Sequence, residues 1–453
     1  MVQALMAFRR GGPTGGVNPV AIVGGGISGL AAAVDLSSRG IPVAVLEQKP
    51  FLGGRAYSFK DAVTGDTVDN GQHVLIAACK HTLHFLERIG TRHLLQSQKN
   101  PSLLFHHPRR GFRTLRIMPF PPPLHLAGGV LACGLFSVAD RLRILRGGMA
   151  AGRASERALR DATIAQWLEA SGQSEEARRS FWEPLAVSVM NEHCDKASAA
   201  VFVEALRQAF LEGRRNSAMM IPSVGLSDLY VDASASFISE HGGTVRCSAE
   251  VEGVESDQRS VHGVRLRDGS AMQCSAAILA LPPARLFPVL PEHLRASGFL
   301  SGVASLPFSP IVSIHLWFDR DVMPQDFVGV IGRRIQWMFR RAGHVSLVMS
   351  AAHEYVSATN EDLIAAGMED LRAVVPTVPE RPVHALVIRE KRATFSCTPE
   401  TERFRPGTRT PLENLFLAGD WTATGLPATI EGAVISGERA ADQAWCRLSP
   451  LPG

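Results

Sequence analysis

The chain has 453 residues, of which 45% are hydrophobic and 20% charged, a composition that predicts a globular protein long enough for two domains. The net charge is only +4, and no run of Lys and Arg alternates with aromatic residues, which argues against nucleic-acid binding. No stretch reaches the roughly eighteen uninterrupted apolar residues of a transmembrane helix, so no membrane span is predicted.

Seven cysteines are scattered along the chain, without a CxxC pair or a Cys/His spacing that suits a metal ion. An odd number of unpaired thiols is typical of a reducing compartment, so we expect a cytoplasmic protein without a metal site. Residues 1–18 are Gly-rich and lack the apolar core and cleavage site of a signal peptide. They predict a disordered lead.

The first predicted strand, Val20 to Val23, runs into a glycine turn and an Ala/Leu-rich helix that ends at Gly40. A second strand, Pro42 to Leu46, ends in Glu47. Together they form a strand–turn–helix unit with the spacing GxGxxG followed by an acid, which predicts a dinucleotide site. The turn residues assigned to the cofactor are Gly24, Gly26, Ile27, Ser28 and Gly29.

The glycines of this turn have separate physical roles. Gly24 allows the tight turn, Gly26 lets the backbone approach a pyrophosphate, and Gly29 lets the helix pack on the strand. Glu47 is expected to accept hydrogen bonds from a ribose, and an acid at this position argues against a 2′-phosphate. A second glycine pair and an arginine follow at Gly53-Gly54-Arg55, where they suit a second approach to the pyrophosphate.

The apolar segment 117–138 contains three consecutive prolines and is followed by Arg141, Arg143 and Arg146. One interpretation is a Pro-rich loop that leads into a buried helix. The other is a membrane-surface segment within residues 117–146 that dips into the bilayer, with its arginines at the lipid phosphates. The sequence leaves both interpretations open.

The middle of the chain alternates between helical and strand patterns. Helices are predicted in ATIAQWLEAS, SEEARRSFWEPLAVSVM and SAAVFVEALRQAFLEG. HGGTVRCSAEVEGVES (241–256) predicts a hairpin-like strand pair, VHGVRLRDGSAMQC continues the meander, and SAAILALPP predicts a further buried strand. PIVSIHLWF and HVSLVMSAA predict strands of a later sheet.

The C-terminal segment repeats the arrangement of the first turn. Leu415 to Ala418 predicts a short strand, followed by Gly419-Asp420, a Gly/Pro-rich turn and a small-residue helix. A helix N-terminus offers unpaired N–H groups and a partial positive charge, which favour an anionic or polar ligand.

The GGR element after the ribose acid, combined with the distant Gly419-Asp420, resembles the flavoprotein family of amine oxidases and phytoene desaturases. The resemblance implies FAD, bound by Gly54 and Arg55, with Asp420 near the ribityl chain and phosphates and the Val251 backbone at the adenine. We therefore expect an α/β fold with a discontinuous Rossmann-like FAD-binding domain (residues 19–92, 224–283 and 405–445). An inserted α+β substrate-binding domain would comprise residues 93–223 and 284–404.

Further motifs resemble the hydroxysqualene dehydroxylases of the bacterial hopanoid pathway. They are DNGQH (69–73), FWEPLAVSVMNE (181–192), IPSVGLSDLYVD (221–232), SPIVSIHLWFDR (309–320) and the segment 392–441. The resemblance implies hydride transfer from reduced FAD to hydroxysqualene, a C30 isoprenoid alcohol, and a hydroxysqualene-forming prenyl synthase upstream. Glu192-His193-Cys194 departs from the Thr/Pro-rich stretch expected there, so no catalytic role is assigned to these three residues.

Such a reaction needs a proton for the departing hydroxide. His73 is the first candidate, because an imidazole can hold a proton near neutral pH; a structural hydrogen bond is the alternative. Glu431 is the second candidate, and its alternative is a helix-start acid favoured by the dipole. The substrate pocket is assigned to Trp421, Pro427 and Thr429, with plain core packing as the alternative for Trp421.

Three other functions are compatible with parts of the pattern. A carotenoid- or phytoene-type desaturase shares the cofactor motifs and differs in redox direction. An amine oxidase is disfavoured because the chain has only three tyrosines, too few to support a tyrosine cage at the flavin. A non-catalytic prenyl-lipid carrier, similar to the Rab escort proteins, is disfavoured by Gly419-Asp420.

Overall fold

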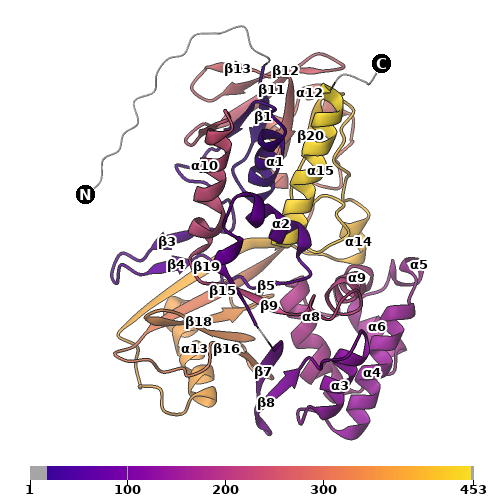
Figure 1. Ribbon diagram of the computed structural model, residues 1–453, viewed down its shortest axis with the longest axis vertical. Helices are drawn as coiled ribbons and strands as arrows, with labels where there is room; N and C mark the ends of the chain where they lie inside the picture. The colour runs from indigo at the N-terminus through magenta and orange to yellow at the C-terminus, as the bar shows by residue number, and fades with distance from the viewer. Residues whose placement is uncertain (1–17, 99, 450–453) are drawn as a thin grey trace.

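The computed structural model describes residues 18–98 and 100–449. Nearly all of the predicted disordered lead, residues 1–17, lies outside the described residues. Figure 1 shows a parallel sheet with its helices in the upper part and a larger sheet beside a group of helices in the lower part.

The upper part is organised around a five-stranded sheet in the order β10-β2-β1-β14-β20, in which every neighbouring pair is parallel. All four residues of β1, β2 and β14 are buried, as predicted for strands covered on both faces. The sheet therefore joins segments from the start, middle and end of the chain. Its strands are β1 Val20–Val23, β2 Val43–Leu46, β10 Thr244–Arg246, β14 Ala276–Leu279 and β20 Leu415–Leu417.

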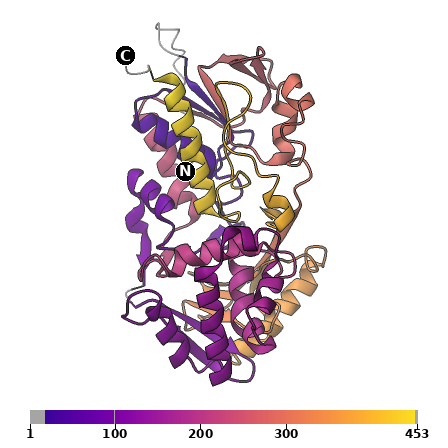
Figure 2. The same ribbon diagram turned by 90° about the vertical axis from the view of Figure 1, so that its right-hand side faces the viewer.

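Two helices from opposite ends of the chain pack against each other beside this sheet, α1 (Ile27–Ser38) and α15 (Ile430–Leu448). Figures 1 and 2 both show α15, in yellow, next to the indigo α1. Small residues allow this close approach, because a Cβ on Gly437 would overlap the backbone carbonyl of Ser28. The predicted glycine end of the first helix is confirmed at Gly40, which has a φ of 75°.

The predicted hairpin across residues 241–256 is wrong. β10 joins the parallel sheet next to β2, whereas β11 (Val251–Ser256) pairs antiparallel with β12 (Val261–Leu266). The chain between the two strands follows the exit of β2, since Ser248 N donates to Lys49 O and Ala249 N to Glu47 O. The meander from β12 to β13 (Ala271–Gln273) is confirmed.

The lower part contains a seven-stranded sheet in the order β19-β15-β18-β17-β16-β7-β8. One face packs on α13 (Asn360–Val374) through a core that includes Ile314 and Leu371. The predicted strands around residues 310–318 and 344–352 are confirmed as β15 and β18. The strands are β7 Ser102–His107, β8 Gly111–Arg116, β15 Phe308–Trp317, β16 Phe327–Val330, β17 Trp337–Arg340, β18 His344–Met349 and β19 His384–Phe395.

The three predicted helical segments are confirmed and belong to a group of helices beside this sheet. Its core includes Trp167 and Trp182, whose rings meet edge to face with their centroids 5.4 Å apart. The helices are α3 Leu124–Ala132, α4 Val138–Arg153, α5 Glu156–Leu159, α6 Ile164–Ala170, α7 Glu175–Ala177, η2 Arg178–Trp182, α8 Glu183–Met190 and α9 Ala199–Phe210. Within residues 18–98 and 100–449, no helix is both long and apolar enough to cross a bilayer.

Shorter elements connect these parts. They are β3 Ser58–Lys60, β4 Thr67–Asp69, β5 Leu75–Ile76, α2 Lys80–Arg88, η1 Arg92–Leu94, β6 Leu95–Ser97, β9 Met219–Pro222, η3 Ser227–Val231, α10 Asp232–Glu240, α11 Pro283–Val289, α12 Glu292–Ala296 and α14 Pro399–Glu402.

Candidate active site

A cavity of about 970 Å³ is lined by residues of both parts of the molecule. One arm of the cavity is bordered by the first glycine turn, the GGR element and the C-terminal Gly-Asp turn. The other arm is bordered by apolar side chains of the seven-stranded sheet and of α8 and α9. The predicted cofactor residues are therefore gathered at one cavity, although they lie at opposite ends of the chain.

The first glycine turn has the geometry that the GxGxxG pattern predicts. Gly24 has a φ of 109°, and a Cβ there would overlap the carbonyl of Ala280. A Cβ on Gly29 would overlap the carbonyl of Gly24, which explains the need for glycine where helix and strand meet. Gly24, Gly26, Ile27 and Ser28 line the cavity, and no side chain caps the N-terminus of α1. Its first backbone N–H groups can therefore bind a phosphate.

Glu47 lies at the end of β2 and borders the same arm. Its Oε2 accepts a hydrogen bond from Gly25 N at 2.7 Å, and its Oε1 accepts one from Lys49 N at 2.9 Å. Glu47 thus fixes the glycine turn relative to β2. Its contact with a ribose stays a prediction.

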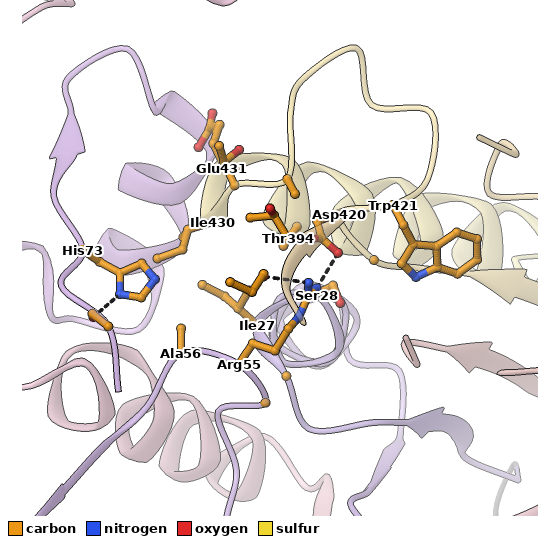
Figure 3. A pocket seen from close by; sticks show the side chains of 18 of the residues that line it. Ile27, Ser28, Arg55, Ala56, His73, Thr394, Asp420, Trp421, Ile430 and Glu431 are labelled. Carbon is orange, nitrogen blue, oxygen red and sulfur yellow. Dashed lines mark hydrogen bonds and ion pairs between the residues drawn. The ribbon is translucent and has the colours of Figure 1, made fainter. Parts of the chain in front are cut away.

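The GGR element packs directly on the first turn. Gly53 forms a bridge with Gly26, and a Cβ on Gly54 would lie 3.0 Å from Gly26 Cα. Arg55 Nη2 lies 2.5 Å from Asp420 Oδ1, and its Nη1 donates to Ala393 O at 3.1 Å (Figure 3). Burial disfavours the charged guanidinium, but the Asp420 carboxylate outweighs it and the pKa of Arg55 is raised.

The C-terminal turn is held by its own side chains. Gly419 has a φ of 146°, and its N–H donates to Ser436 Oγ at 2.8 Å. A Cβ on Gly419 would overlap the indole of Trp421, which explains the glycine. Trp421 borders the cavity but is only 2% exposed and donates to Leu281 O at 3.0 Å. Its indole therefore packs against the core and supports the turn, and its contact with substrate stays a prediction.

Pro427 and Thr429 border the cavity, and Thr429 also caps α15 by accepting a hydrogen bond from Gly432 N at 3.1 Å. Val251, the first residue of β11, lines the cavity as well. Whether Val251 contacts adenine, and whether Pro427 and Thr429 contact substrate, stays a prediction.

Arg405 is a residue of the site that the sequence analysis missed. Its buried guanidinium donates to three carbonyls of the turn, those of Asp420, Thr422 and Leu426, at 2.5 to 3.0 Å. It also lies over the ring of Phe395, with 4.9 Å between the guanidinium carbon and the ring centroid. Arg405 therefore sets the shape of the turn that carries Asp420. An arginine in the loop after α14 gives no signal of its own in a single sequence.

His73 lines the cavity, and its Nδ1 lies 2.6 Å from Gly71 O. Because a carbonyl can only accept, the proton of the ring belongs on Nδ1 and Nε2 is left as an acceptor. Burial lowers the pKa of His73, and the opposing charge of Asp69 does not cancel that effect. The imidazole is therefore neutral near pH 7, and its role as an acid stays a prediction.

Glu431 is buried at the start of α15 and caps a different helix, α2. Its Oε1 accepts from His81 N at 3.0 Å, and its Oε2 accepts from Thr82 N at 2.8 Å and from Thr82 Oγ1 at 2.6 Å. Figure 3 shows Glu431 directed away from His73. Both carboxylate oxygens are thus used in holding α2 against α15. A catalytic role for Glu431 stays a prediction.

The apolar arm was not predicted residue by residue. Alternate residues on one face of the seven-stranded sheet form one wall, and helix residues form another. The lining side chains are Leu103, Leu185, Val189, Leu206, Phe210, Met219, Ile311, Trp337, Phe339 and Val348. The period-2 pattern of the strands could have identified the wall, but only with knowledge of which face α13 covers.

Comparison with known proteins assigns the chain to a family. The model of the flavin-containing amine oxidoreductase family matches residues 27–444. The chain is 31% identical to a hydroxysqualene dehydroxylase of Sinorhizobium fredii, covering 94% of this chain and 98% of that protein. It is 30% identical to a hydroxysqualene dehydroxylase of Rhodopseudomonas palustris, covering 93% and 97%, respectively. A 15-cis-phytoene desaturase of Synechococcus elongatus is 24% identical, with 95% and 97% covered.

Solved structures agree on the fold. An oxidoreductase from Methanosarcina mazei superposes with a TM-score of 0.73 at 19% identity, covering 93% of this chain and 99% of that one. A cyclohexylamine oxidase from Brevibacterium oxydans gives a TM-score of 0.68 at 16% identity, covering 94% and 98%. The predicted α/β fold with a Rossmann-like FAD-binding part is thereby confirmed, and FAD is the cofactor. The chain belongs to the flavin-containing amine oxidoreductase family, and it is more similar to the hydroxysqualene dehydroxylases than to the phytoene desaturase.

Proposed function

We propose that this protein reduces hydroxysqualene to squalene with loss of the hydroxyl group. The observation that carries the proposal is a single cavity with a polar arm built for a dinucleotide and an apolar arm bordered by sheet and helix side chains. The similarity to two hydroxysqualene dehydroxylases over nearly the whole chain supports the assignment of substrate.

The residues of the polar arm fit FAD. The free N-terminus of α1 is suited to the pyrophosphate, Glu47 to a ribose, and the paired Arg55 and Asp420 to the phosphates and the ribityl chain. When bound in its reduced form, the flavin supplies the hydride. The chain itself supplies placement, exclusion of water and the handling of the proton.

The apolar arm is suited to a long isoprenoid. The side chains that border this arm are aromatic or aliphatic and suit an alkyl chain. Polar side chains lie where this arm meets the polar arm. The arrangement favours a substrate with one polar group on a long hydrocarbon. His73 borders this cavity and is proposed to exchange a proton or hydrogen bond with that group, and Glu431 is proposed to support the same wall.

A desaturase of the phytoene type is the second candidate, because a phytoene desaturase also matches nearly the whole chain. Redox direction separates the two. Anaerobic incubation of the protein with hydroxysqualene and chemically reduced FAD is expected to give squalene. No squalene under these conditions, together with oxidation of phytoene by the oxidised protein, would overturn the proposal.

An exposed apolar and basic surface accompanies the site. We call it the α3–α4 surface; Leu124 and Leu142 on it are 58% and 59% exposed. Other exposed apolar residues in this region are Phe120, Leu131, Val138 and Met149. Residues 109–153 contain eight arginines and one acid, Asp140, which is buried and hydrogen-bonded to Ser137 and Ser174.

We propose that the α3–α4 surface contacts anionic lipid at the inner face of the cell membrane. Exposed apolar side chains would enter the headgroup region while arginines meet the phosphates. A cytoplasmic protein in that position could receive its apolar substrate from the membrane, supplied by a hydroxysqualene-forming prenyl synthase.

A further inference from the structure

Strand β19 contains a bulge where it borders the cavity. Ser309 of β15 pairs with Thr394, whereas Ile311 pairs with Glu390. Between these two pairs, β19 therefore contains two more residues than β15. Pro310, which lacks an N–H group, lies opposite the bulge. Bulges next to active sites redirect side chains, and here Glu390, Ala393 and Thr394 all line the cavity.

Glu390 lies at the junction of the polar and apolar arms. Its neighbour on β15 is the apolar Ile311, which borders the cavity beside it. Among the described residues, its carboxylate has a single hydrogen-bond partner, Asn70 Nδ2, at 3.4 Å from Oε2. Burial lowers the pKa of Arg55, but Asp420 and, to a smaller extent, the charge of Glu390 raise it. Glu390 is thus close to the Arg55–Asp420 pair and still has oxygen atoms free for a ligand.

Thr394 is held by a buried asparagine. Asn191 Nδ2 donates to Thr394 Oγ1 at 2.9 Å, while Asn191 Oδ1 accepts from Ala351 N at 2.7 Å. Asn191 has a φ of 48°, a left-handed conformation that costs energy for a residue with a side chain. Because Asn191 uses an acceptor site of Thr394 Oγ1, the hydroxyl proton of Thr394 is available to an acceptor in the cavity. Figure 3 shows Thr394 beside Arg55 and Asp420.

We infer that Glu390 is the acid that protonates the departing hydroxyl group, and that Thr394 donates a hydrogen bond to the same oxygen. The inference rests on the proposed function. The C–O bond breaks with its electron pair on oxygen, the oxygen takes the proton of Glu390 and leaves as water. The reduced flavin, when bound, would supply the hydride that this carbon needs. Glu390, left as a carboxylate, regains a proton from solvent before the next turnover.

The two proton donors expected from the sequence are less suited to this step. His73 carries its proton on Nδ1, which already donates to Gly71 O. Glu431 has both oxygens occupied by α2.

The variant Glu390→Gln tests the acid. It is expected to retain FAD and to bind hydroxysqualene, but to form squalene at least about 100-fold more slowly, as expected for a lost general acid. The corresponding allylic fluoride has a far better leaving group than the alcohol. Glu390→Gln is therefore expected to convert the fluoride to squalene at a rate within about threefold of the wild-type rate. Glu361→Gln, an exposed carboxylate on α13, is the matched control and is expected to behave as wild type.

The variants Thr394→Val and Thr394→Ser test the hydrogen bond without turnover. Wild-type protein is expected to bind hydroxysqualene more tightly than squalene, measured by the change in the flavin absorption spectrum. Thr394→Val should lower this preference about tenfold, whereas Thr394→Ser should retain it.

The role of Glu390 and the proposed function are overturned by different results. If wild-type protein converts hydroxysqualene but Glu390→Gln does so within about threefold of its rate, Glu390 is not the acid and the proposed function stands. An equal slowing of alcohol and fluoride in Glu390→Gln would also overturn the inference, since it would show a structural role. If wild-type protein neither binds nor converts the alcohol, the proposed function itself is wrong.

Discussion

Arg55 Nη2 lies 2.5 Å from Asp420 Oδ1, although 365 residues separate the two along the chain. The pair joins the GGR element to the C-terminal turn at the edge of the cavity, and Arg405 holds the carbonyl side of the same turn. The cofactor arm is therefore one connected structure made from both ends of the chain.

Replacing Asp420 with Ala should weaken FAD binding about tenfold or more, because Arg55 loses its partner and the flavin loses a polar contact. Flavin content after gel filtration and titration of the stripped protein with FAD measure the effect. The exposed pair Arg295–Glu292 provides the control, and Glu292→Ala should leave FAD affinity unchanged. Full retention of FAD by Asp420→Ala would contradict a cofactor role.

Replacing Glu47 should also lower flavin content, since its carboxylate fixes the first glycine turn. Glu47→Ala removes the acceptors of both Gly25 N and Lys49 N, whereas Glu47→Gln keeps one oxygen acceptor and should lose less FAD. Equal flavin content in both variants and the wild type would count against the ribose role.

His73→Ala should leave the protein loaded with FAD but lower turnover about tenfold or more. Because the pKa of His73 lies below the usual value of 6.5, its protonated fraction increases only as the pH falls further into the acid range. Because Glu390 is the proposed acid, wild-type turnover that accelerates on acidification while His73→Ala does not would instead identify the protonated ring of His73 as the acid. Turnover in His73→Ala equal to that of the wild type would remove His73 from the mechanism.

Stability should fall on acidification through a second histidine, His315 of β15. Burial, with help from His344 and Arg341, lowers the pKa of His315 to about 3, and its side chain is 2% exposed. Below its usual pKa the unfolded chain takes up a proton that the folded chain does not, so the free energy of unfolding decreases. The expected slope is about 1.4 kcal/mol per pH unit between about pH 6.5 and 3.

Urea unfolding at a series of pH values measures this dependence. His315→Phe removes the titrating ring while keeping an aromatic side chain, and it should flatten the slope in this range. An unchanged slope in the variant would show that other groups dominate acid unfolding.

Replacing exposed apolar residues of the α3–α4 surface with acidic residues tests the membrane contact. The double variant Leu124→Glu/Leu142→Glu should lose most of its binding to phosphatidylglycerol vesicles in a flotation assay, since two exposed apolar anchors become acidic. Val383 is also exposed, at 70%, but lies outside this surface, so Val383→Glu is the matched control. Wild-type protein that fails to float with anionic vesicles would contradict the proposal.

The parts of the structure that follow local rules could be predicted from the sequence. β1, the glycine turn and α1 were predicted because each depends on nearby residues and a short glycine pattern. The pairing of β10 with β2 could not be predicted from nearby residues. It is accompanied by backbone hydrogen bonds to Lys49 and Glu47, which lie almost two hundred residues earlier in the chain. Glu390 and Thr394 were missed for the same reason, because a bulge in β19 defined by its partner β15 directs them into the cavity.

The five-stranded sheet also has a consequence for the biosynthesis of the protein. The strand β20 and the Gly419-Asp420 turn leave the ribosome long after β1, β2 and Arg55, although Asp420 contacts Arg55 in the folded protein. The nascent chain therefore presents only half of the flavin-binding surface during most of translation. Cofactor uptake is confined to the finished polypeptide, and a chain released before residue 419 should fail to become yellow.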